Sequence, residues 1–173
     1  MTFVIGPASS ADGPSILEIT EHVGVFTPTE LSCVEELWNA YRDKGEASGY
    51  MFLIYRDDDS RPLGYATFGP HPLTQGTYDL YWIAVDPIAQ GHGVGHALLA
   101  QVETEVLARG GRLLLVETSD ASAYASARQL YETGGYRREA AIRDFYAPGD
   151  SLLMFSKSLT SAGAMRDILG VSH

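Results

Sequence analysis

The sequence is poor in cysteine and has no long apolar run. Cys33 is the single cysteine among 173 residues, so no disulfide can form within the chain. It lies in the helix-like stretch TELSCVEELWNAY, where we expect a buried side chain. No run approaches the roughly 20 apolar residues that a membrane span needs, and the N-terminal residues lack the pattern of a signal peptide. These absences predict a soluble, cytoplasmic protein.

Positive charge is also scarce. The chain has 12 lysines and arginines against 22 aspartates and glutamates, with a net charge of -10 and a pI of about 4.8. Nucleic-acid binding needs clustered basic side chains, so this balance argues against nucleic acid and favours a neutral or cationic partner. The composition is that of a globular protein, and we expect one domain over residues 1–160 and a tail or short helix over 161–173.

Apolar periodicity predicts the elements of the first half. Residues 2–9 alternate weakly as a strand, and residues 13–44 carry two helical patterns, the second with Thr29 as its predicted N-cap. Residues 50–70 are predicted as an antiparallel hairpin whose charged turn is centred on Asp58. Consecutive carboxylates in a turn diverge, so we expect a solvated turn there rather than a metal site.

The second half alternates strands and helices. The aromatic segment 77–85 is predicted as a central strand, and the apolar run 112–119 as a strand buried on both faces. A helix closed by glycine is predicted over 124–135, followed by strands over 136–146 and 150–159. A further helix is predicted between the strands at 77–85 and 112–119. This order of elements predicts an α/β (α+β) fold of one mixed sheet with helices on its faces.

A glycine-rich turn opens that further helix. The stretch QGHGVGH contains Gly91, Gly93 and Gly95, and the residues after it are apolar at helical spacing. A helix N-terminus presents unpaired amide N–H groups and the positive end of its dipole, and glycines leave room for an anion. Strand, turn and helix together predict a pyrophosphate site.

Two common phosphate-binding motifs do not fit this turn. A P-loop needs a lysine and then a serine or threonine after its last glycine, and neither is present. A dinucleotide fingerprint needs G-x-G-x-x-G, but its last position falls on His96 or on Leu98, depending on which glycine begins the count.

A third pattern fits. Gln90, Gly93 and Gly95 match the signature [Q/R]-x-x-G-x-[G/A] directly after a strand that ends IAVDP, and ARQLYETGGY matches A-x-x-L/F-Y-x-x-x-G-F/Y. On these motifs the sequence resembles the GNAT superfamily of N-acetyltransferases. The resemblance covers residues 50–160, and the N-terminal helices by their order. It implies a mostly antiparallel sheet with helices on both faces.

The resemblance also implies acetyl-coenzyme A as cosubstrate and no metal. In the family the glycine loop holds the pyrophosphate, and the strands matched here by 78–85 and 112–118 splay apart around the pantetheine arm. Main-chain groups of the first of these strands pair with that arm, and the Val85 N–H would polarise the thioester carbonyl. The implied cofactor-binding residues are Ile83, Ala84, Val85, Gln90, Gly91, His92, Gly93, Val94, Gly95 and His96.

Two catalytic residues follow from the resemblance. Tyr131 occupies the tyrosine of the second motif, and a phenol is suited to protonating a leaving thiolate. Asp79 matches the position at which several members carry a glutamate that acts as the general base. Strand alternation would place Asp79, Tyr81 and Ile83 on the same face. A carboxylate is a weak base, so Asp79 would need burial or a relay water, and Glu117 is the alternative base.

The chain departs from the family pattern at three positions. Histidines His92 and His96 replace the usual basic residues of the loop, so backbone N–H groups would carry more of the anion binding. As a metal site these histidines lack the glutamate of H-E-x-x-H and a third ligand. Tyr124 stands where many members have an asparagine that helps to hold coenzyme A, and Arg128 is the predicted substitute.

The predicted function is acetyl transfer to an amine by direct attack in a ternary complex. The acceptor is a small molecule or a protein amino group, in keeping with the acidic composition. The alternative is an acyl-CoA-binding sensor that has lost turnover, which the missing asparagine and basic loop residues motivate. Edge strands over 137–159 are compatible with a homodimer.

Overall fold

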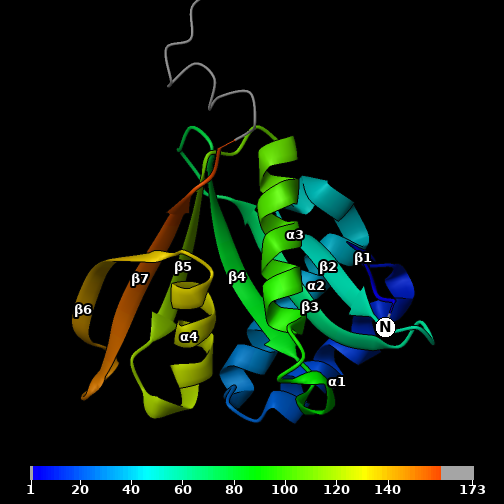
Figure 1. Cartoon of the computed structure of the whole chain (residues 1–173), viewed down its shortest axis with the longest axis horizontal. Helices are drawn as coiled ribbons and strands as arrows, with labels where there is room; N and C mark the ends of the chain where they lie inside the picture. The colour runs from blue at the N-terminus through cyan, green and yellow to red at the C-terminus, as the bar shows by residue number, and fades with distance from the viewer. Residues whose placement is uncertain (1, 161–173) are drawn as a thin grey trace, which may run out of the picture.

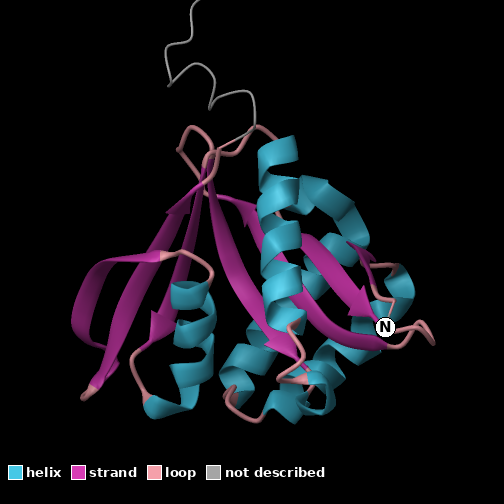
Figure 2. Ribbon diagram, viewed as in Figure 1, coloured by secondary structure: helices cyan, strands magenta, loops and turns pink. Residues whose placement is uncertain are grey.

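The computed structural model of the protein describes residues 2–160 and consists of a seven-stranded sheet with helices on both faces (Figures 1 and 2). The strand order is β1-β2-β3-β4-β5-β7-β6, and among the strand pairs of the described residues only β4–β5 is parallel. The predicted fold class and the central position of residues 77–85 are therefore confirmed. The strands are β1 (Val4–Pro7), β2 (Met51–Arg56), β3 (Pro62–Pro70), β4 (Thr77–Val85), β5 (Leu113–Ser119), β6 (Arg137–Ala147) and β7 (Asp150–Ser158).

Two apolar clusters cover the two faces of the sheet. Helices α3 (Val94–Ala108) and α4 (Ala125–Thr133) pack on one face, and α1 (Gly13–Val23) and α2 (Pro28–Lys44) on the other. Figure 1 shows α3 running along β4 in front of the sheet, with α1 and α2 behind it. The predicted tail over 161–173 lies outside the described residues. Within residues 2–160 no helix is long and apolar enough to cross a membrane.

The start of α2 differs from the prediction. Its N-cap is Thr27, whose Oγ1 accepts from the Glu30 N–H at 3.2 Å, while Glu30 Oε2 accepts from the Thr27 N–H at 2.7 Å. Proline is favoured at the first helical position because it has no N–H to leave unpaired, so Pro28 follows the cap and the predicted Thr29 lies within the first turn.

Two predictions of burial are wrong for related reasons. Cys33 is exposed, because Val34 and Trp38 form the buried stripe of α2 and the preceding position is rotated by about 100° away from it. In β5, Leu114 and Val116 are buried, whereas their neighbours Leu113 and Leu115 are partly exposed. Leu114 and Val116 belong to the apolar cluster under α3, so β5 buries this face and leaves the other partly exposed.

A bulge in β4 sets the geometry of the centre of the sheet. Thr67 of β3 pairs with Trp82 and the next residue, Phe68, pairs with Leu80, which leaves Tyr81 as the extra residue. Leu80 and Ile83 both pack against the cluster under α3. Asp79, the neighbour of Leu80, therefore faces the opposite side from Ile83, and the predicted common face of Asp79, Tyr81 and Ile83 is wrong.

Strands β4 and β5 diverge just after this bulge. Their pairing runs from Thr77 with Leu113 to Leu80 with Val116 and goes no further. Beyond that point the edge of β4 that faces β5 has no neighbouring strand among the described residues. This agrees with the expectation that the strands at 78–85 and 112–118 splay apart. The fold therefore leaves a gap beside residues 81–85.

Candidate functional site

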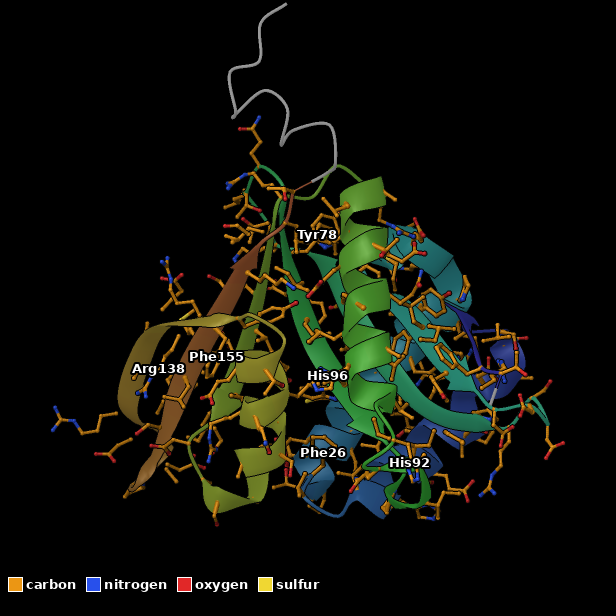
Figure 3. All side chains as sticks on the ribbon, viewed as in Figure 1. Phe26, Tyr78, His92, His96, Arg138 and Phe155 are labelled. Atoms are coloured by element: carbon orange, nitrogen blue, oxygen red, sulfur yellow. The ribbon has the colours of Figure 1, made fainter. Side chains whose placement is uncertain are left out.

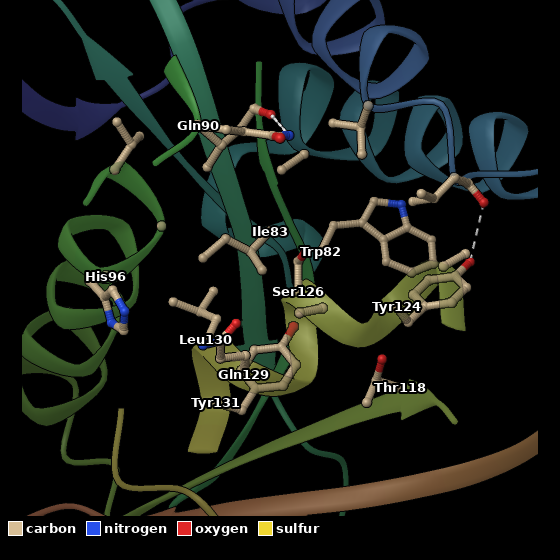
Figure 4. Close-up of a pocket in the computed structure, with 18 of the residues that line it drawn as sticks. Trp82, Ile83, Gln90, His96, Thr118, Tyr124, Ser126, Gln129, Leu130 and Tyr131 are labelled. Carbon is tan, nitrogen blue, oxygen red and sulfur yellow. Dashed lines mark hydrogen bonds between the residues drawn. The ribbon is translucent and has the colours of Figure 1, made fainter. Parts of the chain in front are cut away.

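A cavity of about 630 Å³ fills this gap and extends on both sides of it. Its wall comes from the end of α1 and the start of α2, from β4, from the glycine turn and α3, and from α4 and the residues before it. Figure 4 shows residues of β4 and α4 facing each other across the space. The cavity is therefore continuous from the start of α3 to the segment between α1 and α2.

The glycine turn forms one end of the cavity. Gly91 and Gly93 have φ of 77° and 80°, a conformation that other residues rarely adopt, and a side chain added at either would meet nothing within 4 Å. The Gln90 Nε2 donates to the Val85 carbonyl at 3.1 Å and ties the turn to the end of β4. The turn is thus held in place while its inner surface stays open.

The start of α3 supplies unpaired donors to that end. The Ala97 N–H donates to the Gly93 carbonyl at 3.0 Å, which is the first turn of the helix. The amide groups of Val94, Gly95 and His96 precede it and have no partner within the helix. Together with the helix dipole they favour an anion at this point.

The main chain of β4 offers a second set of polar groups. The Asp86 N–H donates to the Leu63 carbonyl of β3 at 2.8 Å. Successive residues of a strand direct their N–H and C=O groups to opposite sides, so those of Val85 and Ile83 point toward the gap. An extended polar arm could pair with them as an added strand.

The cavity collects most of the predicted cofactor-binding residues. Two of them, His92 and Arg128, lie outside its wall. His92 lines a separate cavity of about 300 Å³ beside the Asp57–Asp59 turn. Arg128 donates hydrogen bonds of 2.8 and 2.7 Å to the carbonyls of Ser119 and Ala121. Figure 3 shows His92 in the turn below α3 and His96 at the start of that helix. The predicted residues in the wall are Ile83, Ala84, Val85, Gln90, Gly91, Gly93, Val94, Gly95 and His96.

Tyr131 projects from α4 into the middle of the cavity (Figure 4). It is 5% exposed, and its ring packs against Tyr136 and Phe155. Burial raises the pKa of its phenol above the ordinary value, so the hydroxyl keeps its proton throughout the neutral range. Within residues 2–160 its hydroxyl has no hydrogen-bond partner that would compete with a ligand for the proton.

The two predicted bases lie outside the wall of the cavity. Glu117 is an exposed residue of β5. Asp79 is two residues from Tyr81, which does line the cavity, and its Oδ2 lies 2.7 Å from Nδ1 of His71. Burial, followed by the nearby Asp79 carboxylate, raises the pKa of Tyr81 to about 12. His71 is absent from the predicted site because no motif of the sequence marks it.

The end opposite to the glycine turn is aromatic and acidic. Phe26 stacks on Trp82 with ring centroids 6.2 Å apart, and the Tyr124 hydroxyl donates to Glu30 at 3.1 Å. Burial, then Glu30, raises the pKa of Tyr124 to about 12. Burial also raises the pKa of Tyr146 beside this end, with Glu117, Asp150 and Glu30 adding to the effect. Aromatic faces and carboxylates are the groups that bind an organic cation.

The comparison with known families agrees with this arrangement. Residues 17–136 match the sequence model described as the Acetyltransferase (GNAT) family. The chain belongs to the GNAT family. The glycine turn, the diverging strands and Tyr131 all lie within or between elements of the matched region.

Three similar proteins illustrate the range of similarity. A GNAT-family structure from Desulfovibrio desulfuricans is 39% identical, with a TM-score of 0.88 over 92% of this chain and 100% of that one. The structure of yncA from Salmonella typhimurium with its cofactor acetyl-CoA shares the fold at 21% identity, with a TM-score of 0.72 over 93% of this chain and 96% of that one. Mycothiol acetyltransferase of Mycolicibacterium paratuberculosis is 32% identical over 111 residues, 59% of this chain and 34% of that protein. The chain thus spans about a third of that curated relative.

Proposed function

We propose that this chain is an N-acetyltransferase that moves an acetyl group from acetyl-coenzyme A to a small amine by direct attack in a ternary complex. The observation that carries the proposal is the continuous cavity. It joins a helix start with unpaired amide groups, a strand edge that no other strand of the described residues covers, a buried phenol and an acidic aromatic end. The first two parts would hold the coenzyme, the phenol would act on its sulfur, and the acidic aromatic end would hold the amine.

The residues at the glycine end fit the coenzyme. Gly91 and Gly93 leave open space where any larger residue would place a side chain, and the amide groups at the start of α3 are free to bind a pyrophosphate. Ile83 and Val85 would pair with the pantetheine arm, and the Val85 N–H would donate to the thioester carbonyl. The coenzyme supplies an activated acetyl group as a thioester.

The acidic end fits an amine acceptor. A protonated amine gains from Glu30 and from the aromatic faces of Trp82 and Tyr124, which line the cavity there. The Glu30–Tyr124 hydrogen bond spans this end, which favours a small molecule over a folded protein. The Tyr131 hydroxyl would donate its proton to the sulfur as the thiolate departs.

Ligand-induced stabilisation tests the cofactor. Thermal unfolding is measured with saturating acetyl-CoA, CoA, ATP and NAD, because a ligand at 100 times its dissociation constant adds about 2.7 kcal/mol to the folded state. We expect a shift with acetyl-CoA and CoA alone. A shift with ATP or NAD instead, or none at all, contradicts the proposed coenzyme.

Transfer to a panel of small amines tests the reaction. We expect Tyr131→Phe to lower kcat by about 100-fold while the shift in melting temperature with acetyl-CoA stays as in the wild type, because the hydroxyl acts on the leaving group. Tight binding of acetyl-CoA without transfer to any amine would instead identify a sensor.

A further inference from the structure

A histidine lies against the Asp79 carboxylate. His71 is the first residue after β3, and its Nδ1 lies 2.7 Å from Asp79 Oδ2. The Asp79 side chain is 17% exposed, whereas that of His71 is 45% exposed. The carboxylate is thus held at the sheet surface, and the imidazole lies closer to solvent.

The chemistry of this contact fixes the proton on the ring. An ionised carboxylate only accepts hydrogen bonds, so His71 Nδ1 donates and carries the proton. In the neutral ring the lone pair is then on Nε2, on the far side from Asp79. A carboxylate that orients an imidazole in this way also stabilises the cation that forms when the ring accepts a proton.

The pair borders the cavity through Tyr81. Asp79 and Tyr81 are two residues apart on β4, and a strand rises about 3.3 Å per residue, so about 7 Å separates their positions. A chain of two bridging waters spans such a distance. Asp79 lies on the face opposite to Leu80 and α3, whereas Tyr131 reaches the cavity from the α4 side. Asp79, with its histidine, and Tyr131 therefore lie on opposite faces of the sheet.

We propose that His71 is the general base of the transfer and that Asp79 is the positioning residue that orients it. The inference rests on the proposed function and changes one part of the sequence prediction, in which the Asp79 carboxylate takes the proton itself. At neutral pH an imidazole is a far better proton acceptor than a carboxylate.

A proton leaves the acceptor ammonium and passes through the bridging waters to Nε2 of His71, where Asp79 pairs with the imidazolium. The amine nitrogen forms a bond to the acetyl carbon, and the bond from that carbon to sulfur breaks. The thiolate takes the proton of the Tyr131 hydroxyl, and the second proton that leaves the nitrogen restores Tyr131. The imidazolium then releases its proton to solvent.

Few other ionisable groups surround the pair. From the sheet, Tyr81 faces Asp79, and Tyr50 meets Tyr81 edge to face at 5.5 Å. From the loop side, the Arg112 Nε donates to the Gln75 carbonyl at 2.7 Å, in the same β3–β4 loop as His71. Burial and the Asp79 carboxylate raise the pKa of Tyr81, so this phenol keeps its proton at neutral pH and does not compete with His71 for the proton of the acceptor.

The tautomer of His71 gives a test that needs no turnover. Histidine ring ¹⁵N–¹H correlation spectra of the full chain are compared for the wild type, His71→Gln and Asp79→Ala, and His71 is identified by its loss in the first variant. We expect the neutral ring to carry its proton on Nδ1 in the wild type and on Nε2 in Asp79→Ala. A wild-type proton on Nε2 would overturn the proposal.

The protonation of the acceptor gives the kinetic test. The probes are n-propylamine, an ammonium at pH 7, and methoxyamine, which is largely unprotonated there. His71→Gln should lower kcat/KM for propylamine by about 100-fold and leave methoxyamine almost unchanged, because only the first must lose a proton before attack. The loss with propylamine should shrink as the pH rises from 7 to 10, since free amine then forms in solution.

His22→Gln is the matched control. The His22 side chain is 49% exposed and its Nδ1 lies 3.0 Å from Asp86 Oδ2, so it forms the same kind of pair beside the opposite end of β4 from His71. This variant should keep the wild-type ratio of the two probes.

The outcomes separate the two proposals. A wild-type chain that acetylates neither probe contradicts the proposed function. If the wild type acetylates both probes and His71→Gln lowers kcat/KM equally for both, the assignment of His71 as the base is wrong while the proposed function stands. The same holds if the wild type acetylates methoxyamine only, because no group then removes the proton of the ammonium.

Discussion

The Tyr124 hydroxyl donates a hydrogen bond of 3.1 Å to Glu30 Oε1 across the acidic end of the cavity. The other oxygen of the same carboxylate accepts from the Thr27 N–H and closes the capping box of α2. Glu30 therefore has two roles, one as a helix cap and one as a charge in the wall of the cavity. Glutamine can serve in a capping box as glutamate does, so a substitution can remove the charge and keep the cap.

Glu30→Gln is expected to raise KM for a cationic acceptor by about tenfold, the factor that corresponds to about 1.4 kcal/mol, and to leave KM for acetyl-CoA unchanged. The comparison is Tyr124→Phe, which removes the hydroxyl but keeps the charge and should have the smaller effect on the acceptor. Steady-state kinetics with each substrate varied in turn measures both values. A larger change in the KM of acetyl-CoA than in that of the amine would place Glu30 at the coenzyme instead.

The parts of the site that depend on backbone conformation could be predicted from the sequence. Gly91 and Gly93 adopt positive φ, which few other residues tolerate, so the turn leaves a clear record in residue type. The helix after it follows from apolar periodicity. The motif that identifies Tyr131 is short and lies within one helix, and the structure forms that helix as α4.

The parts that depend on contacts between distant residues could not be predicted. The extra residue at Tyr81 arises from the register of β3 against β4, and it reverses the face on which Asp79 lies. His71 meets Asp79 because the β3–β4 connection folds back on the strand. Cys33 lies in an amphipathic pattern, and a shift of one position in that pattern separates a buried residue from an exposed one.

Two glycines of the turn should differ in their tolerance of alanine. Gly93→Ala places a side chain at a φ of 80° and should lower the free energy of unfolding by about 1 kcal/mol. At Gly95, in the first turn of α3, an added Cβ would meet Leu130 at 3.4 Å, an ordinary contact. Gly95→Ala should therefore be neutral or stabilising, since alanine favours a helix. Urea unfolding of the unliganded variants measures the difference, and equal losses would contradict this account of the turn.

The pair of Asp12 and Arg56 should make stability depend on pH below neutrality. Burial opposes the charge of Asp12, but hydrogen bonds of 2.7 Å from Arg56 and from the Ser9 N–H prevail and lower the pKa of its carboxyl. The unfolded state therefore binds the proton more tightly. The pair's contribution is complete above the unfolded-state pKa of about 4 and is lost as the pH falls through the lower folded-state value.

Asp12→Asn is accordingly expected to lower the free energy of unfolding by about 2 kcal/mol at pH 7 and by much less at pH 2.5, a difference that chemical denaturation at the two pH values measures. The control is Asp43→Asn, because Asp43 pairs with Arg42 at the surface, where its side chain is 60% exposed, and exposed pairs add little. A loss for Asp12→Asn that is the same at both pH values would show that shape, and not charge, is what the substitution removes.

His96 should make coenzyme binding depend on pH. It lines the cavity at the start of α3, and its Nε2 lies 3.4 Å from Thr133 Oγ1, whereas His92 lines the neighbouring cavity with the Asp57–Asp59 turn. A bound phosphate favours the protonated imidazole, so the affinity for CoA should rise by about fivefold between pH 8 and pH 6, the factor for a surface pair of about 1 kcal/mol. Calorimetric titration should show that His96→Gln removes most of this dependence and His92→Gln little of it. A wild-type affinity that stays flat over this range would mean that the backbone amides bind the pyrophosphate without help from either histidine.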